Sequence, residues 1–364
     1  IHPVQSAAAG RTAMFSTTVD ATGPPSGRPA VAIVGMGVEI GPVNDLKAFQ
    51  TAVLKGTSVI GARPQHRFRG SDAAAEKYLG KSAACGAFMD TVALEPGQFR
   101  IPPNQLTDIL PQHLLMLKVA GAALDDAGLP RRRSRRRMGA VMGIGFDYEA
   151  TRFHLRWSLA NDNERWKQQL DLDLDDRQTA EWLIKLRDAC GPPLTHARTM
   201  GALAGVIASR IAREFRLGGP SFTVSAEETA GLKALEIAVR SLQQNETDTM
   251  LAGAVDMAGD LRNVVIAHAL RGFAAGPAIR PFDRRADGCL PADGAVCLVL
   301  KRLDTAIDAG DRIYAVIRGL GHAGSGGGRQ TTADAYERSL KQCFDDAGRV
   351  PDHVSYLEAH GSGD

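Results

Sequence analysis

The most informative segment is Gly218-Gly-Pro-Ser-Phe-Thr-Val-Ser-Ala-Glu-Glu-Thr-Ala-Gly-Leu232. Its two glycines are typical of a helix end, and Ser221 to Val224 has the apolar character of a short strand. A helix is predicted from Thr229 to Gln244, because apolar residues recur along one face. These residues are Leu232, Leu235, Val239 and Leu242. The segment therefore predicts a sharp turn from strand to helix, with two adjacent glutamates in it.

Strand and helix patterns alternate on both sides of this turn. Short apolar runs predict strands at 31–35, 138–145, 250–255, 295–300, 314–319 and 354–358. Amphipathic patterns predict helices at 46–54, 112–127, 199–217, 304–309 and 334–347. Such alternation predicts an α/β protein in which helices pack on mainly parallel sheets.

Composition excludes several classes of protein. The chain has 364 residues, 44% of them apolar and 23% charged, and its net charge of +2 does not favour a nucleic-acid binder. The five cysteines lie far apart without a CxxC pair, which favours reduced thiols in a cytoplasmic protein and no metal site. No run of 18 apolar residues is present, so no membrane span is expected, and the start of the chain does not resemble a secretory signal.

The chain divides into three regions. Residues 1–29 are rich in Ala, Ser, Thr, Gly and Pro without periodicity, which indicates a linker or a cloning remnant. Residues 30–258 form the first predicted half. Within it, residues 146–197 are polar and rich in Trp and Asp, and we expect them to form an insertion over the sheet. Residues 259–364 form the second predicted half.

Seven segments carry a family resemblance, in order from residue 30 to the end. They are Ala30-Val-Ala-Ile-Val-Gly-Met-Gly; Leu110-Pro-Gln-His-Leu-Leu-Met-Leu-Lys-Val; Gly218-Gly-Pro-Ser-Phe-Thr-Val; Ala238 to Val255; Arg280-Pro-Phe-Asp-Arg-Arg-Ala-Asp-Gly with Asp293-Gly-Ala and Val299-Leu-Lys-Arg-Leu; Gly310-Asp-Arg-Ile-Tyr-Ala-Val-Ile-Arg-Gly; and Tyr356-Leu-Glu-Ala-His-Gly-Ser-Gly. Together they resemble β-ketoacyl synthases, the condensing domains of fatty-acid and polyketide synthases.

The resemblance implies a thiolase-like, five-layer α/β/α/β/α fold of two related halves. In the family, a cysteine at the turn from strand to helix takes an acyl chain from the phosphopantetheine arm of an acyl carrier protein. The helix N-terminus favours the thiolate, and nearby backbone N–H groups hold the oxyanion. No bound cofactor is expected, since the glycines after residue 34 do not fit the dinucleotide fingerprint.

Two departures from the family pattern change the expected function. The position of the family cysteine falls on Glu228, and the neighbouring Ser225, Glu227 and Thr229 differ as well, so the whole turn is rewritten. The chain also stops at Asp364, before the further lysine and second histidine of the family. We therefore expect the second half to be incomplete in this chain.

The resemblance also indicates candidate site residues. Glu228 and His360 stand at the positions of catalytic residues, and Glu227 and Thr229 are candidates for the substrate pocket or the oxyanion site. Asp283, Asp287 and Asp293 lie in the loops near the family's active site, where we expect them to hold the loop backbone. The remaining candidates are six arginines, Arg131, Arg132, Arg133, Arg135, Arg136 and Arg137. They fit either a solvated loop or a docking patch for an acidic carrier protein.

Three functions fit these residues. The leading hypothesis is a non-condensing ketosynthase-like domain of the chain-length-factor type, which pairs with an active ketosynthase or a second copy and shapes an acyl pocket. The turn is most similar to the ketosynthase-like domains of polyunsaturated fatty-acid synthases. The alternatives are a malonyl-thioester decarboxylase acting through His360 and Glu228, and a purely structural dimer partner. None of these hypotheses involves nucleic acid or a membrane.

Overall fold

The computed structural model describes residues 28–64, 66–67, 72–82, 84–145, 152–193, 195–257, 261–326 and 332–363. The predicted tail at residues 1–29 lies outside the described residues, apart from its last two. The predicted boundary between the halves, at residues 258–259, lies outside them too. Among the described residues, no helix is long and apolar enough to cross a membrane.

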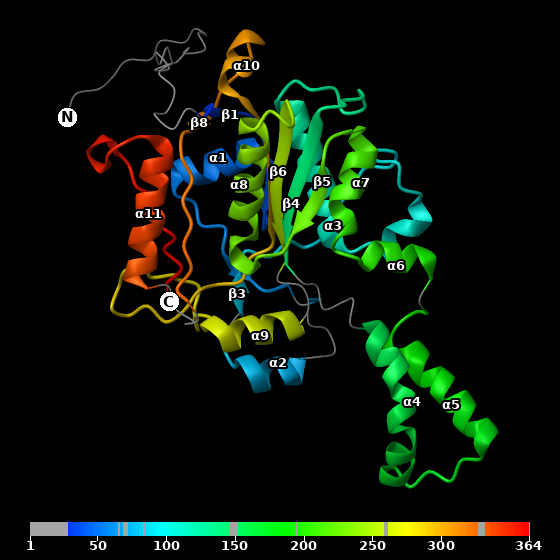
Figure 1. Ribbon diagram of the computed structural model, residues 1–364. Helices are drawn as coiled ribbons and strands as arrows, with labels where there is room; N and C mark the ends of the chain where they lie inside the picture. The colour runs from blue at the N-terminus through cyan, green and yellow to red at the C-terminus, as the bar shows by residue number, and fades with distance from the viewer. Residues whose placement is uncertain are drawn as a thin grey trace, which may run out of the picture.

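A six-stranded sheet forms the centre of the molecule (Figure 1). In spatial order its strands are β5 (Ser221–Val224), β4 (Met138–Ile144), β6 (Thr249–Asp256), β7 (Gly294–Arg302), β1 (Val31–Ile40) and β8 (Ala315–Ile317). Each overlaps a predicted strand. A separate two-stranded ladder joins β2 (Gly61–Ala62) to β3 (Cys85–Gly86).

The prediction of mainly parallel strands is wrong for this sheet. β4 runs parallel to β5 and β6, but β7 runs antiparallel to both of its neighbours, β6 and β1, and β8 runs antiparallel to β1. Sequence periodicity could not show this, because a buried strand reads as a short apolar run whichever way its neighbours run.

Helices cover both faces of the sheet. α3 (Pro111–Asp126) and α7 (Val206–Phe215) pack on one face, where Leu115, Ile211 and Phe215 are fully buried. α8 (Ala230–Gln243) packs on the other face through Ala234, Ala238 and Leu242. The side chains of each strand alternate between these two cores, as strand geometry requires.

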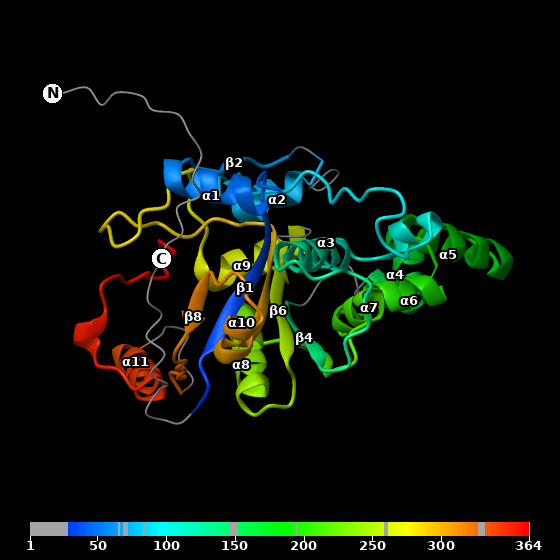
Figure 2. The same cartoon turned by 90° about the horizontal axis from the view of Figure 1, so that it is seen from above.

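The remaining helices lie around this centre. α9 (Leu261–Arg271) and α2 (Asp72–Leu79) share a small core that includes Val264 and Phe273, and they lie side by side below the sheet in Figure 1. α1 (Leu46–Lys55), α10 (Leu303–Asp308) and α11 (Ala333–Ala347) surround β1 and β8, as Figure 2 shows from above. α11 is tied to α8 by two hydrogen bonds from Arg240 to Asp346, at 3.1 and 2.9 Å.

The single helix predicted over 199–217 is two helices, α6 (His196–Ala202) and α7. The Gly201 carbonyl accepts a hydrogen bond of 3.1 Å from the Leu110 backbone N–H instead of continuing the helical ladder. Leu203, which lies inside the predicted helix, has an extended backbone and is 50% exposed. A contact with a segment distant in the sequence therefore overrides the local pattern.

The predicted insertion does not lie over the sheet. Its described residues form a helical hairpin, α4 (Arg152–Gln169) and α5 (Asp176–Cys190), which projects away from the body in Figure 1. We call this hairpin the arm. α5 begins at a capping box, in which Asp175 accepts from the Gln178 backbone N–H and the Gln178 side chain accepts from the Asp175 N–H. The apolar and polar residues of α4 are distributed around the helix, so α4 has no single apolar face that could pack on the sheet.

The strand predicted at 354–358 is absent from the structure. Tyr356 and Leu357 are 77% and 69% exposed. A strand needs a neighbour to complete its hydrogen-bond ladder, and no strand among the described residues pairs with this segment.

Candidate functional site

The candidate site lies at one edge of the sheet. β4, β5 and β6 are parallel, so their carboxyl ends meet at the same edge, where ligands bind in many α/β proteins. The turn with the two glutamates follows β5, and α9 comes after β6. In Figure 1 the start of α8 and the whole of α9 are close together at this edge.

A strained backbone shapes the turn. Residues Glu227–Thr229 form a short 3-10 helix, and Glu227 has a φ of 48°, in the left-handed region that non-glycine residues seldom adopt. The Thr229 hydroxyl closes the turn by donating to the Ala226 carbonyl at 2.8 Å. Gly143 of β4 lets the start of α8 come close, since a Cβ there would lie 2.6 Å from the Ala230 carbonyl oxygen. The predicted turn from strand to helix is therefore confirmed.

Glu228 forms an ion pair with Arg271 at the end of α9. The Glu228 side chain is 62% exposed and that of Arg271 is 29% exposed. The pair joins the turn after β5 to the segment that follows β6. Sequence reasoning missed Arg271, because it belongs to none of the motifs that resemble the family.

A series of backbone hydrogen bonds connects Arg271 to the end of the chain. The Gly272 carbonyl accepts from the Cys289 N–H at 3.2 Å, and the Gly288 N–H donates to the Gly363 carbonyl at 2.9 Å. The structure therefore brings together the glutamate turn, the end of α9, the 280–289 loop and the segment that carries His360.

His360 itself is exposed. Among the described residues, no hydrogen bond or ion pair joins His360 to Glu228. The two predicted catalytic residues thus lie on segments that are linked through the end of α9 and the loop that carries Gly288. The other imidazole nearby is His268 of α9, whose Nδ1 accepts from the Phe273 N–H at 2.8 Å. This bond orients the imidazole ring toward the backbone at the end of α9.

The three aspartates occupy different environments. Asp293 is fully buried, and its Oδ2 accepts from the Arg67 side chain at 2.5 Å and from the Met89 N–H at 2.8 Å. Asp283 is a surface group, and hydrogen bonds from Arg285 lower the pKa of its carboxyl. Asp287 lies 3.4 Å from Arg280. These contacts are those of loop-holding residues, and that role stays a prediction.

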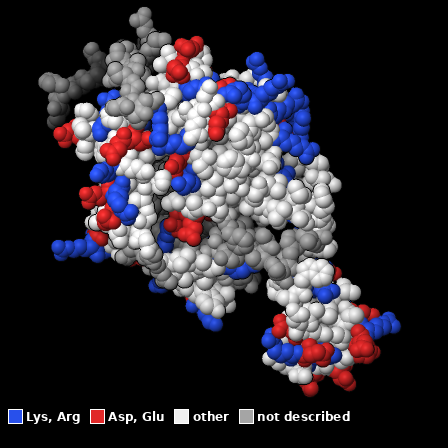
Figure 3. All heavy atoms as spheres, in the orientation of Figure 1, with Lys and Arg blue, Asp and Glu red and all other residues white. Residues whose placement is uncertain are grey.

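The arginine segment, residues 131–137, is partly neutralised within the chain. Arg131 pairs with Asp125, Arg132 with Glu214 and Arg137 with Asp248. Arg135 donates to the carbonyls of Pro130 and Arg133, and burial is the main cause that lowers its pKa. Arg133 and Arg136 are exposed and make no ion pair within the described part of the chain. Figure 3 shows basic side chains gathered on the body, well away from the arm.

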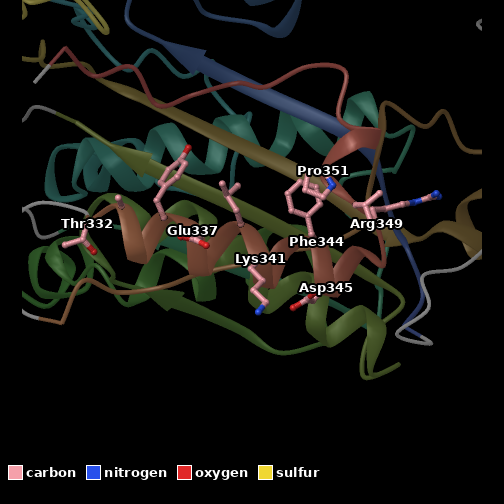
Figure 4. A pocket seen from close by; sticks show the side chains of 11 residues that line it. Thr332, Glu337, Lys341, Phe344, Asp345, Arg349 and Pro351 are labelled. Atoms are coloured by element: carbon pink, nitrogen blue, oxygen red, sulfur yellow. The ribbon is translucent and has the colours of Figure 1, made fainter.

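A groove lies elsewhere, along α11. It has a volume of about 890 Å³, and Figure 4 shows that its lining side chains come from α11 and the turn after it. Tyr336, Leu340 and Phe344 supply its apolar surface. Neither Glu228 nor His360 lines it, so it is not the site that the motifs predict.

Two buried groups complete the description. The side chain of His113 in α3 is fully buried, and neither ring nitrogen has a hydrogen-bond partner among the described residues. Burial, and secondly the charge of Arg210, lowers the pKa of His113 to about 4. Cys297 of β7 is also fully buried, and burial raises the pKa of its thiol to about 12. Cys297 is therefore a core residue rather than a nucleophile.

Comparison with known proteins identifies the family. Residues 28–306 match the family model for the N-terminal domain of β-ketoacyl synthases. That match covers more than half of the chain, so the chain belongs to the β-ketoacyl synthase family.

Relatives and solved structures agree with this assignment. The chain is 31% identical over 349 residues to a mycocerosic acid synthase-like polyketide synthase of Mycolicibacterium smegmatis, covering 92% of the chain and 15% of that protein. It is 28% identical over 319 residues to a polyunsaturated fatty acid synthase component of Thraustochytrium sp., covering 86% of the chain and 15% of that protein. Among solved structures it resembles the PfaC keto synthase–chain length factor, with a TM-score of 0.73, 24% identity, and coverage of 92% of this chain and 35% of that chain.

The predicted thiolase-like fold is confirmed by this structural likeness. The chain spans 15% of each of the two curated relatives and about a third of the solved chain. It therefore aligns with one part of each of these longer proteins.

Proposed function

We propose that this chain is a non-condensing, chain-length-factor-type domain of a polyketide or fatty-acid synthase. Its role is to pair with an active ketosynthase, or with a second copy, and to shape the pocket that receives the acyl chain. The observation that carries the proposal is Glu228 at the turn after β5, held by Arg271. A carboxylate is a poor acceptor of an acyl group from a thioester, because the product would be a reactive anhydride.

The surroundings of the turn support this proposal. No cysteine lies in the turn itself, and the nearest thiol along the hydrogen-bonded path, Cys289, donates its Sγ–H to the Gly272 carbonyl at 3.5 Å. The turn leads from β5 through a 3-10 turn into α8, and it carries a side chain unsuited to acyl transfer.

The malonyl-thioester decarboxylase is the second candidate. The meeting of the His360 segment with the 280–289 loop beside Arg271 favours it, since decarboxylation needs groups that hold the enolate oxygen rather than a nucleophile. A purely structural partner, without acyl contact, is the third possibility.

Two kinds of partner follow from the proposal. The relatives are multidomain synthases, so the chain would receive its acyl group from the phosphopantetheine arm of an acyl carrier protein and would act beside a ketosynthase. The exposed Arg133 and Arg136 are the proposed contacts for an acidic carrier, because their charges are not neutralised within the described residues.

Acyl transfer is the direct test. The chain is incubated with radiolabelled acyl carrier protein, next to an active ketosynthase as positive control, and both are examined for a covalent acyl adduct and for carbon dioxide release from malonyl carrier protein. We expect no adduct on residues 223–231 and no release. A stable adduct in this turn would contradict the proposal. Release that disappears in His360→Ala would establish the decarboxylase instead.

A further inference from the structure

The arm leaves the body close to the edge strand of the sheet. It follows β4, the neighbour of β5, and in Figures 1 and 2 it extends beyond the side of the sheet on which β5 lies. Several of its apolar side chains are about half exposed or more, namely Leu155, Trp157, Leu170 and Ile184. Within the described part of the chain, no other element covers these side chains. The arm therefore offers apolar helix surface to a partner.

The turn of the arm and the end of α7 carry opposite charges. Asp171, Asp173 and Asp176 are exposed between α4 and α5, and none of them forms an ion pair with another described residue. Arg213 and Arg216 are exposed at the end of α7, just before β5, and they too lack an ion pair among the residues that the structure describes. Since β4 and β5 are parallel, the arm and these arginines belong to opposite ends of the sheet in one chain.

Two-fold symmetry brings the two groups of charges together. The edge of β5 is open among the described residues, and two such edges related by a two-fold axis run antiparallel. The start of β5 in one copy then lies level with its end in the other, on the side where the arm leaves the body. Neighbouring strands are about 4.8 Å apart, so β4 of one copy lies roughly 10 Å from β5 of the other. α4 has 18 residues and is about 27 Å long, which is enough to cross this gap.

From this geometry we propose that the arm binds a second copy of the chain, and that each arm of the dimer lies against the end of α7 in the other copy. The apolar side chains of the arm supply most of the affinity. The aspartates of its turn, paired with Arg213 and Arg216, select the surface, because partly exposed ion pairs each contribute little free energy. The inference rests on the pairing with a second copy that the proposed function includes.

Tryptophan emission tests whether the dimer covers the arm, since Trp157, Trp166 and Trp182 all lie in it. We expect the emission to shift to longer wavelength on dilution, with the same midpoint as dimer dissociation followed by sedimentation. Phe222→Glu, which places a charge on the β5 edge, should show the long-wavelength emission at every concentration. An emission spectrum that stays constant while the dimer dissociates would overturn the proposal, as would an unmodified chain that is monomeric throughout.

A charge exchange tests which surfaces meet. One variant combines Asp171→Lys, Asp173→Lys and Asp176→Lys, and the other combines Arg213→Glu with Arg216→Asp. Each variant alone should dimerise roughly tenfold more weakly than the unmodified chain, and high salt should reduce this difference. A mixture of the two should regain the affinity as a mixed dimer, because both of its arm contacts then join opposite charges.

Asp308→Lys is the control, since this exposed residue lies on α10, away from β5, and should leave the dimer affinity unchanged. Variants with native circular dichroism that dimerise as tightly as the unmodified chain, or that regain no affinity when mixed, would exclude the arm contact. Such a result leaves the acyl-transfer test unaffected. An acyl adduct in the turn after β5 would instead remove the proposed function, whatever the arm contacts.

Discussion

His113 links the folding of the chain to pH. Burial lowers the pKa of this imidazole to about 4, whereas a histidine in the unfolded chain titrates near 6.5. Because the folded pKa is the lower one, the unfolded state binds more protons between these values, and stability falls as the pH falls from 6.5 to 4. The loss from this residue is on the order of 3 kcal/mol at the acid end of that window. Above pH 6.5 the residue contributes no pH dependence.

Denaturant unfolding at a series of pH values tests this prediction. His113→Leu replaces the ring with an apolar side chain and should flatten the stability curve between pH 4 and 6.5. His360→Gln is the matched control, because that histidine is exposed and should leave the curve unchanged. Parallel curves for His113→Leu and the unmodified chain would contradict the assignment.

The sequence predicts a site residue where a family motif contains it. It does not predict a residue that only tertiary contacts bring to the site. Glu228 is predictable because it stands at a defined position of the turn. Glu227 is predictable for the same reason, since it is the preceding residue. Arg271 could not be found, since its partner lies on another element and its own neighbours in sequence carry no motif. His113 belongs to one of the motifs that resemble the family, but only the packing of α3 reveals that its ring is buried without a hydrogen-bond partner among the described residues.

At the scale of elements, the arm should unfold before the body. Its two helices bury only Leu159 and Asn163 among the side chains described there, and helices of this length are marginal in water without packing. All three tryptophans of the chain, Trp157, Trp166 and Trp182, lie in the arm. Tryptophan emission therefore reports on the arm alone, while far-UV circular dichroism reports on the whole chain.

In urea, we expect the midpoint of the emission change to lie about 1 M or more below that of the dichroism change. Leu159→Ala truncates one of the two buried side chains of the arm and should lower only the midpoint of the emission change. Ala306→Gly, in α10 of the body, should instead lower the midpoint of the dichroism change. Coincident transitions in the unmodified chain would show that the arm and the body unfold as one unit.

Element types were well predicted wherever the pattern and the tertiary environment agree. The six strands of the sheet and helices α3, α8 and α11 follow their periodicity closely. The failures have a common cause in long-range contacts. The Gly201 carbonyl pairs with Leu110 and divides a helix, β7 runs against both neighbours, and residues 354–358 lack a neighbouring strand within the described part of the chain. Local sequence carries no information on any of these three.

At the scale of the whole molecule, β5 forms an edge of the sheet, and this exposed edge favours self-association. Within the described residues it pairs only with β4, and its Phe222 is 42% exposed. An exposed apolar edge strand offers unpaired backbone groups to a second chain, and proteins usually cover such an edge. We therefore expect a dimer that joins the β5 edges and the nearby helices, with a buried area above roughly 2,000 Å², as is usual for obligate dimers.

Light scattering during size-exclusion chromatography at micromolar concentration tests this prediction. The unmodified chain should elute with the mass of a dimer. Phe222→Glu places a charge in the expected interface and should give a monomer, with a dichroism spectrum that shows the fold intact. Ile307→Glu is the control, since that residue is also half exposed but lies on α10, in contact with β1 and β7 rather than β5. A well-behaved monomer of the unmodified chain, or a dimer that survives Phe222→Glu, would rule out the β5 edge as the interface. A dimer lost equally in both variants would indicate general destabilisation, and the interface would then have to be sought on another face of the body.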